Sequence, residues 1–113
     1  MSITSRMSAL PAAFACLVLA AAPARSACFE SGVGCTDTGL MPYEALRELS
    51  CDSLWSVRNM IYDERGYCFK TERAQEAFDN SGCLYDSAAL VPLNDFERQN
   101  IRRVVTVERE KDC

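Results

Sequence analysis

The residues of this sequence that could do chemistry are its cysteines, its carboxylates and a group of aromatic and basic side chains near its middle. Seven cysteines occur among 113 residues, and there is no histidine. The lack of histidine excludes Ser-His-Asp and Cys-His nucleophile systems. No two cysteines have C-x-x-C spacing, and "SGVGC" lacks the lysine of a phosphate-binding loop. We therefore expect no metal site and no cofactor.

Paired carboxylates are the remaining route to catalysis, as in glycoside hydrolysis. Asp63 and Glu64 are adjacent, but neighbours on a helix project about 100° apart and do not flank one bond. Asp52 and Asp63 are eleven residues apart on the polar face of the same expected helix. A solvated helix face explains these acids, and we predict no catalytic residue.

The first 24 residues have the features of a secretory signal peptide. Arg6 precedes an apolar run of thirteen residues, Leu10 to Ala22, which is too short to cross a bilayer core of about 30 Å. Residues 22–24 fit a small-x-small cleavage site, with cleavage after Ala27 as the alternative. We expect a periplasmic or secreted protein with no membrane span after removal of the signal.

The charge of the chain after residue 24 bears on its partners. Only one of the twelve basic residues lies in the signal, which leaves eleven against sixteen acidic residues and a net charge of -5. Nucleic acids and anionic membranes attract clustered lysine and arginine, so we expect neither as a partner. The remaining 89 residues are enough for one domain with a modest core.

Three helices are expected to position these side chains. Ser50 is a good N-cap for a first helix that ends at Arg65, because Gly66 follows as a left-handed stop. Thr71 begins a second helix that reaches about Asp79. Asn94 begins a third, which has capping-box spacing and continues to about Lys111.

Residues 25–48 are expected to form an irregular cysteine-containing arm with at most a short helical turn, and residues 49–113 the helical domain. The fold class that follows is all-α: a small, disulfide-stapled three-helix domain with an irregular N-terminal arm. Helical periodicity places Phe96 on the apolar side of the third helix and Asn59 on the solvated side of the first.

Two arginines, Arg58 and Arg65, project within the apolar arc of the first helix, where a guanidinium is costly unless it is paired. Glu97 and Glu108 intrude on the apolar side of the third helix. We expect a structural ion pair between Arg58 and Glu108, and expect Arg65 to approach Glu97 and Asn100.

Six cysteines follow the signal, and an even number in a small exported chain predicts three disulfides. Fifteen pairings are possible. We propose the set that closes a short loop in the arm, brackets the second helix, and makes the first and third helices antiparallel: Cys28 with Cys35, Cys68 with Cys83, and Cys51 with Cys113.

A family resemblance is carried by "LSCDSLWSVRNMIYDERGYCFKT", followed by "QEAFDN" and "LNDFERQNI". Over about Leu49 to Arg109 these segments resemble the YARHG domain, a small bacterial extracellular module. Where the family reads Tyr-Ala-Arg-His-Gly, residues 62–66 read Tyr-Asp-Glu-Arg-Gly, so the alanine, arginine and histidine are replaced. The resemblance implies an envelope module that stands alone or beside other extracytoplasmic domains, with no agreed activity.

Tyr62, Arg65 and Tyr67 cluster at the end of the first helix, and aromatic rings beside an arginine suit both sugar faces and carboxylates. They are candidate binding residues, although the same tyrosines could cover the core and the same arginine could satisfy a glutamate. We expect a non-enzymatic, envelope-associated binding module for a glycan or a protein. The alternatives are a periplasmic enzyme inhibitor and a carboxylate-dependent cell-wall hydrolase; the oligomeric state stays open.

Overall fold

The computed structural model describes residues 28, 29 and 34–113, and the expected signal peptide lies outside these residues. Its elements in chain order are β1 (Cys28–Phe29), β2 (Gly34–Cys35), α1 (Tyr43–Arg47), α2 (Cys51–Glu64), α3 (Glu72–Ala77), the 3-10 turn η1 (Ala88–Leu90) and α4 (Asp95–Glu110). The expected all-α, disulfide-stapled class is confirmed for this part of the chain. The two-residue β1–β2 ladder is a local pairing within the arm.

Polar side chains begin α2, α3 and α4 at the three positions that the sequence predicts. Ser50 and Thr71 each accept a hydrogen bond from the backbone N–H three residues later, at 3.1 and 3.2 Å. Asn94 and Glu97 form a complete capping box, with bonds of 2.8 and 2.9 Å. Each cap satisfies a backbone donor that the first helical turn leaves without an intrahelical partner.

The end of α2 is a Schellman stop, as the sequence predicts. The N–H of Tyr67 donates to the carbonyl of Tyr62, and the N–H of Gly66 donates to that of Asp63, both at 3.1 Å. Gly66 has a φ of +89°, which side chains with a Cβ rarely adopt. The rings of Tyr62 and Tyr67 lie 5.7 Å apart, so the chain turns back on itself directly after the helix.

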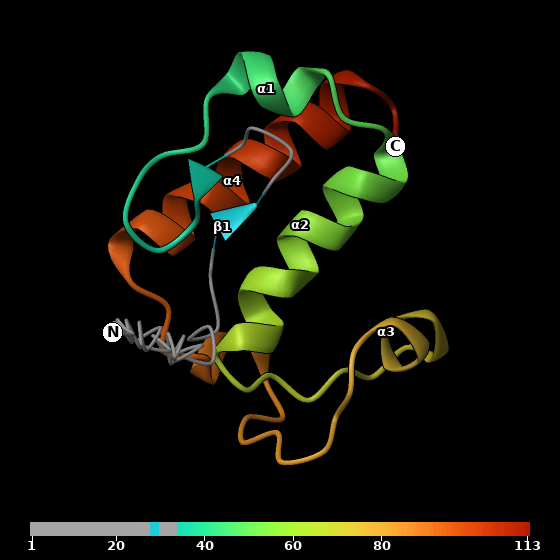
Figure 1. Ribbon diagram of the computed structural model, residues 1–113. Helices are drawn as coiled ribbons and strands as arrows, with labels where there is room; N and C mark the ends of the chain where they lie inside the picture. The colour runs from blue at the N-terminus through green and yellow to red at the C-terminus, as the bar shows by residue number, and fades with distance from the viewer. Residues whose placement is uncertain (1–27, 30–33) are drawn as a thin grey trace, which may run out of the picture.

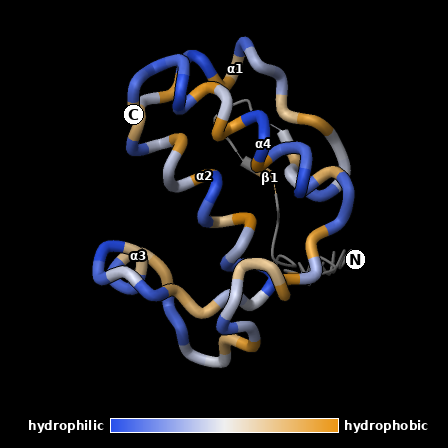
Figure 2. The backbone as a smooth tube through the Cα atoms, turned by 180° about the vertical axis from the view of Figure 1, so that it is seen from behind, coloured by the Kyte–Doolittle hydropathy of each residue, from blue (hydrophilic) through white to orange (hydrophobic). Residues whose placement is uncertain are grey.

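The core lies where α2, α4 and α1 meet. Figure 1 shows α1 across the end at which α2 begins and α4 stops, while α3 and its loops extend from the opposite end of α2. Seen from behind, the three helices alternate hydrophobic and hydrophilic segments, as expected of helices that bury one face (Figure 2). The central buried cluster is Met41, Leu46, Leu54, Val57, Ile61, Val104 and Val107.

Three cross-links connect α2 to α4 and make the helices antiparallel. Cys51 is bonded to Cys113, with their Cα atoms 5.5 Å apart. Farther along, Arg58 donates to both carboxylate oxygens of Glu108 at 2.7 and 3.2 Å, and Arg65 pairs with Glu97 at 2.9 Å. Residues 51, 58 and 65 are seven apart, a spacing that keeps them on one face of a helix. These are the partners that the sequence proposes.

The remaining proposed disulfides are also the ones that the structure contains, Cys28 with Cys35 and Cys68 with Cys83. The first joins β1 to β2 in the arm. The second brackets α3, with its Cα atoms 5.2 Å apart.

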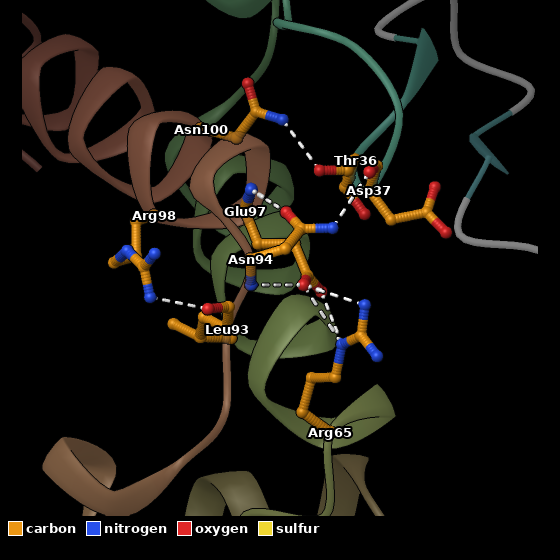
Figure 3. Close-up of polar contacts among 8 residues, drawn as sticks. All are labelled: Thr36, Asp37, Arg65, Leu93, Asn94, Glu97, Arg98 and Asn100. Atoms are coloured by element: carbon orange, nitrogen blue, oxygen red, sulfur yellow. Dashed lines mark hydrogen bonds and ion pairs between the residues drawn. The ribbon is translucent and has the colours of Figure 1, made fainter.

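Asn100 attaches the arm to α4. It is completely buried, accepts from the backbone N–H of Met41 at 2.8 Å, and donates to the carbonyls of Thr36 and Gly39 at 2.9 and 2.8 Å. The expected approach of Asn100 to Arg65 is not seen, because the side chain of Asn100 is directed to the arm and away from Arg65 (Figure 3). Residues 43–47 of the arm form the five-residue helix α1, where the sequence predicts at most a short helical turn.

Aromatic side chains connect α3 to α2. Phe69 stacks on Phe78 at 4.9 Å between ring centroids, and Phe78 lies 5.9 Å from Trp55. Arg73 covers Trp55 at 3.8 Å from the ring centroid. The helix ends at Ala77, earlier than the expected Asp79, because Phe78 is extended and places its ring on Phe69.

Two side chains lie on the opposite face from the one that periodicity predicts. Phe96 is 41% exposed, because the capping box turns the next residue, Glu97, into the interior. Asn59 is buried, and its amide donates to the carbonyl of Trp55 at 2.8 Å. In both cases hydrogen bonds decide which side chain is buried, and the spacing of apolar residues does not predict such bonds.

Replacement of Glu108 should destabilise the protein far more than replacement of Glu110. Glu108 is 15% exposed and holds the 27% exposed Arg58, so Glu108→Ala should lower the free energy of unfolding by about 2 to 3 kcal/mol. Glu110 pairs with Arg47 on the surface, where water and salt screen the pair. Urea denaturation at neutral pH measures both variants, and equal midpoints would contradict this packing.

Asn100→Ala should release the arm from α4. The substitution leaves one buried N–H and two carbonyls without their partner, at a cost of about 1 to 3 kcal/mol for each buried group that water does not reach. The amide of Met41 should then lose its protection against hydrogen exchange, while the amides in the middle of α2 keep theirs. Unchanged protection of Met41 would show that Asn100 does not hold the arm.

Candidate functional site

A cleft of about 440 Å³ opens beside the end of α2. One wall is residues 63–67, the last turn of α2 and its stop, and the other is residues 81–85, the loop after α3, with Asp79 and Pro92 completing the lining. Its volume lies within the range of ordinary ligand sites.

Covalent and backbone bonds hold the two walls of the cleft together. The disulfide Cys68–Cys83 joins them. The carbonyl of Gly66 accepts from the N–H groups of Leu84 and Tyr85 at 2.7 and 3.0 Å, and the N–H of Cys68 donates to the carbonyl of Tyr85 at 2.8 Å. Because main-chain bonds fix both walls, the cleft is formed before any ligand arrives.

The three candidate binding residues take different positions in the structure. Arg65 and Tyr67 line the cleft, whereas Tyr62 does not and packs on the ring of Tyr67. The ring of Tyr67 also contacts Phe69 edge to face at 5.0 Å. Both tyrosines therefore support the wall of the cleft through ring packing, and Arg65 is the charged member of the three.

Arg65 is held by a buried carboxylate. Its Nε donates to both oxygens of Glu97, at 3.0 and 2.9 Å, and Glu97 is only 1% exposed. Glu97 also accepts from the backbone N–H of Asn94, whose side chain donates to the carbonyl of Asp37 (Figure 3). The hydrogen bonds to Glu97 raise the pKa of Arg65. One carboxylate thus caps α4, neutralises Arg65 and fixes the end of α2.

The carboxylates that line the cleft make it acidic. Burial raises the pKa of Glu64, and the negative charges of Asp37 and Glu97 raise it further, while Arg65 opposes them. The pKa of Asp79 is shifted in the opposite direction, because hydrogen bonds from Ser81 lower it. Asp79 is therefore an anion near neutral pH.

Sequence reasoning misses the second wall of the cleft. Leu84, Tyr85 and Pro92 line it, but they stand in a stretch without helical periodicity that the sequence marks only as a loop. The proposed Cys68–Cys83 bridge is the signal that could have found it, since it brings that loop to the end of the first long helix. Glu64 is likewise half-buried, whereas the sequence assigns it to a solvated face.

A second hollow of about 570 Å³ lies near the start of α2 and the end of α4. Its lining includes Arg58 and Glu108, which are paired with each other. Two of its four charged side chains therefore serve the helix contact, and Arg109 and Asp112 are the others.

A family model of the YARHG domain matches residues 33–109 of the chain. The chain belongs to the YARHG domain family. YARHG domains are extracellular or periplasmic modules. The match begins upstream of Leu49 and takes in most of the arm that Asn100 attaches. No curated protein and no solved structure matches the chain.

In this YARHG domain the motif positions, residues 62–66, form the end of α2 and its stop, and residues 63–66 belong to one wall of the cleft. The family glycine is retained as Gly66, where its positive φ is needed. Arg65 stands at the family histidine position and supplies the ion pair to Glu97. The replaced histidine position thus has a structural role in this chain.

Among residues 28, 29 and 34–113, no three histidine, cysteine or carboxylate side chains are grouped so that they could ligate a metal ion. Within the same part of the chain, no helix has the length and apolar character needed to span a bilayer.

Glu64→Gln should make the protein more stable at pH 7. The folded-state pKa of Glu64 lies above its ordinary value, so the ionised side chain costs stability above that pKa, and the cost disappears as the pH falls through it. Urea unfolding should give the variant a higher midpoint than the parent at pH 7 and a smaller difference at about pH 3.5, below the ordinary glutamate pKa.

Glu44→Gln is the control, because it removes the same charge from an exposed site in the first turn of α1. A carboxylate there suits the helix dipole, so this variant should not gain stability. A lower midpoint for Glu64→Gln at pH 7 would contradict the crowding of negative charge at the end of α2.

Proposed function

We propose that this YARHG domain is a non-enzymatic binding module of the bacterial envelope, active in the periplasm or outside the cell. Its ligand, a glycan or an envelope protein, occupies the cleft between the end of α2 and the loop after α3. The observation that carries this proposal is the preformed cleft, whose two walls are joined by Cys68–Cys83 and by three backbone hydrogen bonds.

Rigidity supports a binding role, because a site fixed before association loses little conformational freedom when the ligand binds. The disulfide Cys51–Cys113 and the Arg65–Glu97 pair hold α2 in place behind the cleft. Location supports it as well, since the family consists of extracellular or periplasmic modules.

The chemistry of the cleft favours binding over catalysis. Hydrolysis by two carboxylates requires side chains on opposite sides of the scissile bond. Asp63 and Glu64 are consecutive on one helix and project in different directions, while Asp79 is engaged by Ser81. The sequence also has no histidine to act as a general base.

The proposal predicts retention on envelope material without release of products. The exported protein, with its disulfides intact, is incubated with purified cell wall, and both pelleting and soluble fragments are measured. A parallel pull-down uses envelope extract. We expect the protein to pellet with the wall or to capture an envelope protein, and to release no fragments.

Tyr85→Ala, in the cleft, should reduce this retention, whereas Leu90→Ala, at an exposed position outside the cleft lining, should not. Release of wall fragments by the parent protein would contradict a non-enzymatic role. Absence of both pelleting and capture would contradict the binding proposal itself.

A further inference from the structure

We propose that the ligand of this cleft is a protein segment that presents a lysine or arginine side chain next to an apolar side chain. The inference rests on the proposed function, in that it takes the cleft at the end of α2 as the binding site. The charge of the cleft lining and the packing of its aromatic rings favour a protein ligand over a glycan.

The acids at the end of α2 favour a cationic ligand. Asp63 and Glu64 occupy the last turn of the helix, and that turn has no basic residue. The C-terminal end of a helix carries a partial negative charge, so carboxylates there are destabilising and cations are favoured. This end of the helix therefore favours a basic side chain of a ligand beside the C-cap residue Arg65.

The described lining of the cleft has more acidic than basic side chains. Among the described residues that line the cleft, three carry carboxylates, Asp63, Glu64 and Asp79, and only Arg65 is basic. Arg65 is already paired with Glu97. The cleft therefore has a negative field, which complements a cationic ligand and repels an anionic one.

The cleft also has an exposed apolar wall. Leu84 is 74% exposed, and its side chain lies over Gly66, where an added Cβ would come within 3.5 Å of it. Backbone bonds to Gly66 hold Leu84 in that position, and Pro92 adds a second apolar group to the lining. An apolar side chain of the ligand can be buried against this wall directly beside the acids.

Ring packing limits sugar stacking in this cleft. A glycan site of this kind needs open aromatic faces, but the Tyr67 ring packs against Tyr62 at 5.7 Å and against Phe69 at 5.0 Å, which leaves Tyr85 as the other aromatic side chain of the described lining. A neutral glycan would also offer no positive charge to Asp63, Glu64 and Asp79. A basic and apolar peptide segment uses both features of the cleft.

Short synthetic probes test the inference. Isothermal titration compares three hexapeptides with blocked ends, alternating lysine and leucine, glutamate and leucine, or lysine and serine, together with a hexamer of N-acetylglucosamine. We expect the lysine–leucine peptide to bind at least about tenfold more tightly than the others, equivalent to about 1.4 kcal/mol. Its binding should weaken as salt screens the charges, and its NMR shift changes should fall on residues 63–67 and 81–85.

Paired variants distinguish binding at the cleft from nonspecific attraction of a basic peptide to an acidic protein. Glu64→Gln should weaken lysine–leucine binding about tenfold, whereas Glu44→Gln, on α1 at the far end of the molecule, should not (Figure 1). Leu84→Ala should weaken it, and Leu90→Ala, which is 67% exposed outside the lining, should not. Because Glu64→Gln is expected to stabilise the fold, its loss of affinity would not reflect unfolding.

Each other outcome identifies what has failed. Equal binding of the lysine and glutamate peptides, or tighter binding of the sugar hexamer, overturns the inference. Retention on envelope material without any peptide binding overturns it and leaves the proposed function standing. Absence of both kinds of binding overturns the two together.

Discussion

Placing a guanidinium group between two packed helices costs folding free energy unless a carboxylate pairs with it. This domain depends on two such pairs. Arg58 and Arg65 both project from α2 toward α4, and Glu108 and Glu97 receive them. Both pairs, together with Cys51–Cys113, constrain how α2 lies against α4. The ion pairs thus set the register of α2 against α4, while the apolar core between them could tolerate small shifts.

Glu97 links this register to the cleft. The same carboxylate closes the capping box of α4 and binds Arg65, so the start of one helix and the end of the other are fixed at one point. The stop at Gly66 then turns the chain into the first wall of the cleft. The two ion pairs make the helix contact neutral, whereas the described lining of the cleft has three carboxylates and one arginine.

The sequence predicted what local chemistry determines. The helix starts were predictable because each N-cap residue, Ser50, Thr71 or Asn94, bonds to a partner three residues away. The end of α2 was predictable because the stop at Gly66 depends only on neighbouring residues. The unpaired arginines also pointed to Glu97 and Glu108. The burial of Asn100 and the lining by Leu84 depend on distant backbone, the arm and the loop after α3. No periodicity within one element reports such contacts, so the arm attachment and half of the cleft were missed.

The disulfide between Cys51 and Cys113 closes a covalent ring that contains α2, the cleft and α4, with the Cys68–Cys83 bridge nested inside it. The turn η1, with all three of its residues exposed, lies on this ring and outside the inner bridge. A single proteolytic nick there would open the ring but would leave both pieces of the chain covalently joined, with the inner bridge intact. For a domain outside the cytoplasm, where proteases are encountered, such a nick would not release the wall of the cleft.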